Sequence, residues 1–492
     1  MDDISILHRN RLMRAAGHEE EPDPTGSGTG SSNSSAPPVG IPRRPSAPMQ
    51  NLHWNTIPAD RLQNSIWSLN RANNSATSLG SSASNGATST HGGAAAADMA
   101  EAELIELERL FGHASNGSAG GGSGANRTQV KEGGGAGSSF ATTRNIGALA
   151  EKNKAALKLH LLEKRRAQNI VIGLNPFKSF CATHVDLLKA LCSLNDLQGK
   201  ITADHIDNFR NLLPTDAEMK CIDKIEGSSH PAELFFQAVM RFYPELPRRL
   251  SCFSSCLNFH DNCGSALERS KTIINSCNQV LSSNNLAKLL QRMLVVGNIM
   301  NEGTRRGGAS GFTLDSLLKM VNTKGVDKKT SVLDYVVKSF YDKQEESVLS
   351  VIEDLSLVTD SSKISGKDVV KELSALRTTL TSLENAYAEN KRKHEAEPTF
   401  HSPTAKQMID DFGTKLETYM ASFQGKMLEC DKYKIILERK MVDIVTYFGE
   451  ETDSTGCDTM KIFNVLQEFL TALSFSKAAV EWKIYRSQST SG

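Results

Sequence analysis

The sequence has no surplus of either charge and no long apolar run. Its 492 residues include 56 Lys and Arg and 56 Asp and Glu, so the formal net charge is zero. Nucleic-acid-binding proteins usually carry a basic surplus, and the balance argues against a DNA or RNA partner. No window approaches the ~20 apolar residues of a membrane-spanning helix, and the N-terminal MDDISILHRNRLMRAAGHEEE lacks the apolar core of a signal peptide. We therefore expect a cytoplasmic protein without a membrane span.

The sequence also lacks a cysteine framework and the signatures of common enzymes. Nine cysteines are scattered along the chain, which is typical of free thiols in a reducing compartment. Cys252, Cys256, His260 and Cys263 have the residue types of a zinc site. On a helix they would rise ~16 Å along the axis, which favours a core face over a shared ion. HExxH, GxSxG and kinase motifs are absent, so we expect no metal, no cofactor and no catalysis.

Three segments are too poor in apolar residues to build a core. Residues 21–48 are rich in Pro, Gly and Ser, and residues 70–97 and 113–139 are tracts of Ser, Ala, Gly and Asn. Such compositions cannot offset the entropy of ordering the chain. We expect these segments to be disordered.

Two islands between these tracts have a different character. Residues 49–69 contain Trp54 and Trp67, and residues 99–111 have the periodicity of a short amphipathic helix. The apolar residues on one side of that helix are Leu104, Leu107, Leu110 and Phe111. Because a lone short helix is marginal in water, and tryptophans bury much area only in a pocket, both islands need another surface to cover them.

From about residue 147 onward, helical periodicity continues with few strand signals, which predicts an all-α fold. The most informative stretch is GNIMNEGTRRGGASGFTLDSLL, beginning at Gly297. It leaves an apolar helix, crosses a loop with four glycines, and resumes helical spacing at Phe312. Asn298 and Asn301 can bond to the loop backbone and fix its shape. The loop lacks the order of a phosphate-binding P-loop, and no strand signal precedes it.

Several stretches together resemble the formin homology 2 (FH2) domain. Its signature is a GNxMN run, a glycine-rich loop and a GF-x-L helix start, which this chain has at residues 297–314. WNTI, SIWSL and ELIELERLF resemble its N-terminal lasso, EKRRAQNIVIGL and LLPTDAE its knob, and TYFGE a later aromatic-Gly-acid run, all in family order. The tract at 70–97 departs from the family pattern. The resemblance implies an elongated all-α domain with a disordered tail at 1–48, a lasso at 49–112, a linker at 113–146, a knob at 147–245, a coiled-coil and post region at 246–482, and a tail at 483–492.

The resemblance implies a homodimer closed by the two tryptophans. Trp54 and Trp67 would insert into the post of a second copy, and two reciprocal insertions would close a ring. Packing of both side chains within their own chain is the alternative. The linker between Phe111 and Gly147 would span ~110 Å when fully extended, enough for a loose ring. The receiving surface would consist of Gly297, Asn298, Asn301, Gly311, Phe312 and Leu314.

The resemblance also implies two places of contact with actin. Ile172 aligns with a knob isoleucine that binds actin, and Lys324 aligns with a post lysine placed against an acidic surface of actin. Core packing is the alternative for Ile172 and the better interpretation of neighbouring Ile170. Simple solvation is the alternative for Lys324. Arg165 and Arg166 would add charge that steers association.

We therefore expect an actin-binding protein of the actin cytoskeleton that nucleates filaments and remains on their barbed ends. Only PDP, APP, IPRRP and APM precede Trp54, without the polyproline segment through which formins bind profilin. We expect weak or absent dependence on profilin. Two alternatives stay open: an FH2 protein that caps or bundles filaments or contacts microtubules, and a coiled-coil scaffold unrelated to actin.

Overall fold

The protein is built from helices. The computed structural model describes residues 45–46, 48–68, 99–112, 162–222, 230–243, 245–396, 403–451 and 459–490. Within these ranges the extended contacts are isolated bridges, such as that between Thr56 and Phe312. The predicted all-α fold is therefore confirmed. The low-complexity tract at 70–97, the linker at 113–146 and residues 1–44 of the N-terminal tail lie outside the described residues. No helix in the described part is long and apolar enough to cross a membrane.

A knob of short helices opens the main body. Threonines start two of its helices, because the Thr183 hydroxyl accepts the N–H of Asp186 and the Thr202 hydroxyl that of His205. Phe209 lies edge-on to both Phe177 and Phe235, at ring distances of 5.6 and 5.7 Å, and these rings form the centre of the knob core. The knob elements are α4 (Lys164–Leu174), η4 (Asn175–Ser179), α5 (His184–Cys192), α6 (Ala203–Arg210), α7 (Asp216–Ile222) and α8 (Pro231–Met240).

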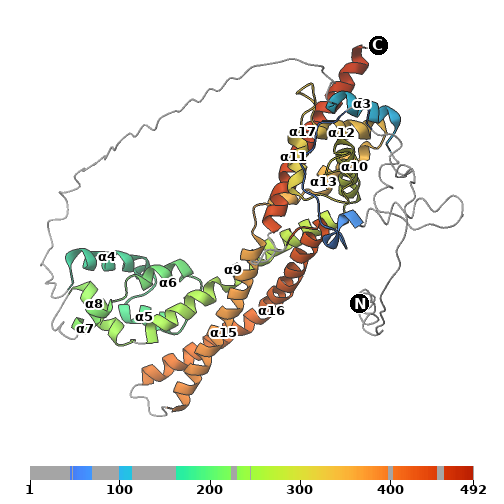
Figure 1. Ribbon diagram of the computed structural model, residues 1–492. Helices are drawn as coiled ribbons and strands as arrows, with labels where there is room; N and C mark the ends of the chain where they lie inside the picture. Colours follow the sequence, from blue (N-terminus) through green and yellow to red (C-terminus); the bar gives the residue numbers. More distant parts are fainter. Residues whose placement is uncertain are drawn as a thin grey trace, which may run out of the picture.

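Three long helices form a rod between the knob and the rest of the body (Figure 1). They are α9 (Glu245–Ser282), α15 (Gly366–Ala396) and α16 (Pro403–Phe448). Phe259 of α9 stacks on Phe423 of α16 with ring centroids 4.2 Å apart. The buried Arg249 guanidinium donates to the Cys192 carbonyl at 3.0 Å and lies 4.6 Å from the ring of Phe412. This one side chain therefore joins the knob to two helices of the rod.

The cysteine cluster lies on α9, as the helical interpretation predicted. Cys252, Cys256 and Cys263 are buried, whereas His260 is exposed on the same helix. Burial raises the pKa of the Cys256 thiol well above its usual range. The three thiols therefore form part of the packed side of the rod.

The post is the compact group of helices at the other end of the rod (Figure 1). Its elements are α10 (Asn284–Met300), α11 (Asp315–Asn322), α12 (Val332–Asp342), η5 (Glu346–Ser350), α13 (Val351–Asp354), α14 (Val358–Ser361) and α17 (Thr459–Thr490). The Ser283 and Ser331 hydroxyls cap α10 and α12. Helix α17 buries the apolar side chains Phe463, Leu466, Phe469 and Leu470. The helix continues to Thr490, past residue 482, where we placed the end of the post.

Candidate functional site

The first island lies against the post of the same chain, and its contacts begin at Trp54. The Trp54 ring is almost fully buried and stacks on Phe312 with centroids 5.4 Å apart and planes inclined by 17°. Its indole N–H donates to the Arg306 carbonyl at 2.9 Å. The ring also lies where a side chain at Gly297 would project, so this position has room for glycine alone.

Trp67 packs on the same phenylalanine, Phe312. Its ring centroid lies 4.5 Å from that of Phe312, with the planes inclined by 55°. A Cβ at Gly311 would lie 2.7 Å from Trp67 Cγ. The buried indole N–H of Trp67 has no acceptor in the described part of the chain. Phe312 is thus the shared platform for both tryptophans, and two glycines allow the close approach.

Hydrogen bonds to the backbone of this island fix its register with the post. The Asn301 side chain accepts the Leu52 N–H at 2.8 Å and donates to the Leu52 carbonyl at 3.0 Å. The Ile57 N–H donates to the Gly311 carbonyl at 3.2 Å, and the Thr313 N–H to the Asn55 carbonyl at 3.0 Å. Asn301 is itself fully buried, so undocking of the segment around Leu52 would leave the Asn301 side-chain amide without these hydrogen bonds.

The glycine-rich loop is held in shape by Asn298, as the sequence suggested. Its amide donates to the Ala309 carbonyl at 2.9 Å and accepts the Ala309 N–H at 2.8 Å. This pair of bonds closes the loop on the end of α10. The predicted receiving residues therefore gather on one surface, with Asn298 shaping the loop and Asn301 contacting the docked segment.

Residues after α16 complete the surface, although sequence reasoning did not place them there. The Glu450 carboxylate accepts the Leu314 N–H at 2.7 Å, at the start of α11. Gly449 adopts a positive φ of 66°, and Ile57 packs against it. Arg61 forms an ion pair of 3.0 Å with Glu451. The available signal was the TYFGE run, which ends in these residues.

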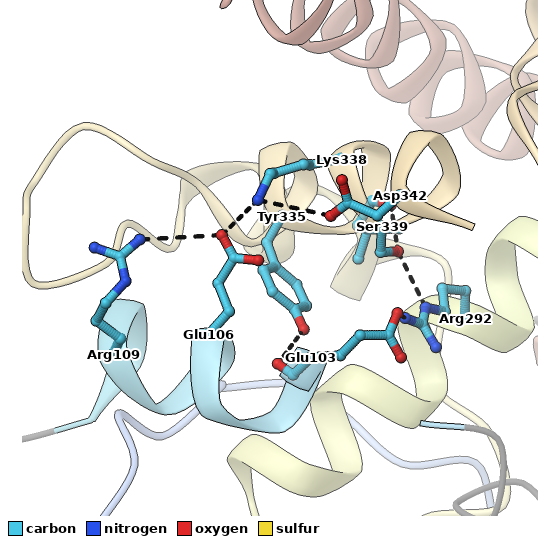
Figure 2. A network of polar contacts seen from close by, with 9 residues as sticks. Glu103, Glu106, Arg109, Arg292, Tyr335, Lys338, Ser339 and Asp342 are labelled. Atoms are coloured by element: carbon cyan, nitrogen blue, oxygen red, sulfur yellow. Dashed lines mark hydrogen bonds and ion pairs between the residues drawn. The ribbon is translucent and has the colours of Figure 1, made fainter. Parts of the chain in front are cut away.

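The second island is the helix α3 (Glu101–Phe111), with the predicted apolar side buried. The Glu103 carboxylate pairs with Arg292 of α10 and lies 3.4 Å from Lys343 Nζ. The Arg292 Nε–H donates to the Ser339 hydroxyl at 3.1 Å (Figure 2). Glu103 and Arg292 are only 13% and 10% exposed, so the pair is largely removed from water.

A second set of contacts holds α3 against α12. The Tyr335 hydroxyl donates to the Glu103 carbonyl at 2.7 Å, and burial raises the pKa of this phenol above its usual range. Lys338 pairs with Glu106 at 2.6 Å (Figure 2). The Phe111 ring packs edge-on to Tyr335 with centroids 6.3 Å apart. Helix α3 is therefore a second anchor beside the tryptophans.

The knob presents Ile172 to solvent. Its side chain is 55% exposed on α4, whereas Ile170 is buried in the knob core. Arg165 is also exposed. Arg166 has internal partners: it donates to the Glu218 carboxylate at 3.2 Å, and to the Asn211 and Leu213 carbonyls at 3.1 and 2.8 Å. Arg166 thus fixes the chain around LLPTDAE, while Ile172 and Arg165 face outward.

Lys324 is exposed on a loop that touches the end of α3. Asp327 organises this loop by accepting the Thr330 O–H at 2.6 Å and the N–H groups of Thr330 and Lys329 at 2.9 Å each. These hydrogen bonds, the Thr330 hydroxyl first, lower the pKa of Asp327 to about 2. The Val326 N–H donates to the Leu110 carbonyl at 2.8 Å. The structure thus places Lys324 beside the docked segment.

These features define a helical scaffold with an N-terminal segment docked on its post. The family model of the Formin Homology 2 Domain matches residues 40–474, and the chain belongs to this family. FH2 domains are non-enzymatic actin regulators, so membership implies an actin-related function and dimerisation. From here on we call residues 48–68 and 99–112 the lasso.

Relatives from plants and animals agree with this assignment. The chain is 28% identical to Formin-like protein 5 of Oryza sativa subsp. japonica over 327 residues, which cover 66% of this chain and 19% of that protein. It is 28% identical to Disheveled-associated activator of morphogenesis 1-A of Xenopus laevis over 329 residues, covering 65% and 28%. It is 26% identical to Formin-like protein 18 of Arabidopsis thaliana over 316 residues, which cover 64% of this chain and 26% of that protein. The chain thus spans between a fifth and somewhat over a quarter of these relatives.

Proposed function

We propose that two copies of this chain form a ring that nucleates actin filaments and stays on their barbed ends in the actin cytoskeleton. The observation that carries the proposal is the exposure of Ile172 on a helix whose neighbouring Ile170 is buried. An exposed aliphatic side chain on a rigid helix suits insertion into an apolar cleft of a partner, where a single buried anchor often dominates the binding energy. Lys324, on the post, supplies a positive charge for a second actin contact.

The ring requires each lasso to dock on the post of the other copy. Fifty peptide units join Gly112 to Leu162, so this connection can span up to roughly 165–180 Å. A reach of this size permits the same lasso contacts between two chains as within one. Two reciprocal dockings related by a two-fold axis then close the ring.

Nucleation follows from holding two actin subunits in one assembly. Forming a filament nucleus from separate monomers costs translational and rotational entropy, which a preformed ring removes in advance. Each copy contributes one knob contact and one post contact. The chain itself performs no bond chemistry, and ATP hydrolysis belongs to actin.

A pyrene-actin assembly assay tests this function. Wild type should shorten the lag, and Ile172→Ala should restore it with the dimer intact. Leu234→Ala is the matched control, because Leu234 is an exposed aliphatic residue of the same knob. In the same way Lys324→Ala should weaken nucleation and Lys328→Ala, an exposed lysine of the same loop, should not.

The same assay separates nucleation from the alternatives. A protein that only caps filaments would slow the elongation of preformed seeds and leave the lag unchanged. An inactive wild type would reject the actin function, and an Ile172→Ala variant with full activity would reject the knob contact.

A further inference from the structure

Helix α16 carries an apolar row that the fold does not use. Leu428, Ile435 and Val442 are 72%, 67% and 51% exposed, although each is a large aliphatic residue. They follow one another at intervals of seven residues, and Ala421, also exposed, extends the row by one more interval. We call these four residues the outer row. The opposite side of α16 supplies the packed side chains that contact α9 and α15.

The spacing identifies what kind of surface would cover the outer row. Seven residues fall short of two turns by only about 20°, so the side chains form a nearly straight line. From Leu428 to Val442 the line runs about 21 Å along the helix axis. A straight line of aliphatic side chains at this interval matches the groove of another helix with the same repeat, rather than a rounded pocket.

Charged residues on the two flanks indicate which helix fits. Asp431 and Glu438 lie three residues after members of the row, and Lys432 and Arg439 lie four residues after them. On a helix these offsets fall on opposite sides of the row, which gives one acidic and one basic edge. Asp431 also pairs with Arg377 of α15, and Glu438 lies 3.9 Å from Lys434.

We propose that the outer row is an interface with α16 of a second copy, in parallel orientation and in register. A two-fold axis parallel to both helices places the acidic edge of each against the basic edge of the other, with Glu438 near the partner's Arg439 and Asp431 near the partner's Lys432. An antiparallel pair would instead place like charges together, which costs free energy. Charge complementarity therefore selects the parallel self-pair.

The interface is small and its affinity should be low. Three aliphatic layers bury far less than the roughly 1,600 Å² of a standard stable interface. In a ring of two copies, the two outer rows would each remain available for another ring. The interface thus joins rings into larger assemblies, and a lasso variant that lacks the ring should still pair through it.

Sedimentation velocity over a concentration series tests the interface. Between about 1 µM and about 100 µM the weight-average mass of wild type should rise to about twice that of one ring or more, because each ring carries two outer rows and the self-association is weak. Ile435→Glu should abolish the rise, because it places a charge in the middle of the row without touching the core. Phe475→Glu is the matched control on α17, since Phe475 is equally exposed on a helix, and it should leave the rise unchanged. A constant wild-type mass, or a rise that persists in Ile435→Glu, overturns the proposal.

Cysteine cross-linking tests the orientation and keeps the proposal separate from the ring. In a Trp54→Ala background, Leu428→Cys and Val442→Cys chains carrying different tags should each cross-link to themselves above the wild-type baseline. Cross-links mainly between the two tagged chains would show an antiparallel pair and overturn the parallel register. Absence of any cross-link above wild type would overturn the interface, whatever the outcome of the actin assays.

Discussion

Exchanging the two charges that anchor α3 to the post tests whether the lasso docks within one chain or between two. Glu103 lies on the lasso and Arg292 on the post, and they form the most buried ion pair between these parts. The perturbation consists of two single variants, Glu103→Lys and Arg292→Glu. Each one places two like charges at the contact. In a ring of one copy of each variant, both contacts again join opposite charges.

The magnitude follows from burial and from the two-fold symmetry. Breaking a buried ion pair by removing one partner costs about 3–5 kcal/mol. A ring made of either single variant has two such defects, so a cost of about 3 kcal/mol for each amounts to about 6 kcal/mol and weakens the dimer roughly 10⁴-fold. Lys343 would still face the introduced lysine. The mixed ring should therefore regain only part of the lost affinity, about 10²–10³-fold.

The assay measures the dimer fraction of each variant alone, of the two coexpressed with different tags, and of each coexpressed with wild type. We expect monomers for each variant, a mixed dimer for the pair, and an intermediate fraction with wild type, because such a ring keeps one of its two contacts. If the lasso docks in its own chain, mixing repairs nothing. A mixture no more dimeric than the single variants would therefore refute the reciprocal ring, and a wild type that is monomeric at micromolar concentration would do so directly.

Three further tests address separate contacts, two of them with a comparison variant. Trp54→Phe should weaken dimerisation because it removes the hydrogen bond to the Arg306 carbonyl, whereas Trp67→Phe should weaken it less, since the Trp67 N–H has no acceptor in the described part; the ratio of the two dissociation constants is the readout. Gly297→Ala should displace the Trp54 ring and cost about 1–3 kcal/mol of docking free energy, measured by the dimer dissociation constant. Arg166→Ala should lower the free energy of unfolding by about 1–3 kcal/mol because three internal contacts are lost, while Arg165→Ala should leave it unchanged in urea denaturation.

Helical periodicity predicted which residues are buried in a helix that packs through a single apolar face. The second island shows this well: its four apolar residues follow the spacing of a helix, and α3 buries the same four. Ile172 was singled out by the resemblance to formins rather than by periodicity, and the opposite burial of Ile170 and Ile172 agrees with two positions that face different directions on one helix. Ile172 is exposed in the structure, and its contact with actin stays a prediction.

Contacts between distant parts of the chain were beyond this reasoning. Glu450 bonds to Leu314, and nothing in either local sequence indicates that partner. Arg166 was expected to be a surface charge, but two of its hydrogen-bond acceptors are carbonyls of a loop more than forty residues away. The outer row of α16 was hidden for another reason, because a long helix with many charges looks the same whether its spare apolar residues are covered or exposed.

The lasso contact and the proposed actin contact of the post are physically coupled. The loop that carries Lys324 bonds to the last turn of α3, since the Val326 N–H donates to the Leu110 carbonyl, and Gly325 approaches that carbonyl too closely for any larger residue. Without α3, this N–H would lose its acceptor and one side of the loop its support. We infer that docking of the lasso orders the loop around Lys324. If the lasso comes from the second copy, each post becomes competent to bind actin only when the ring is closed, so a lone copy would be a poor nucleator even with its knob intact.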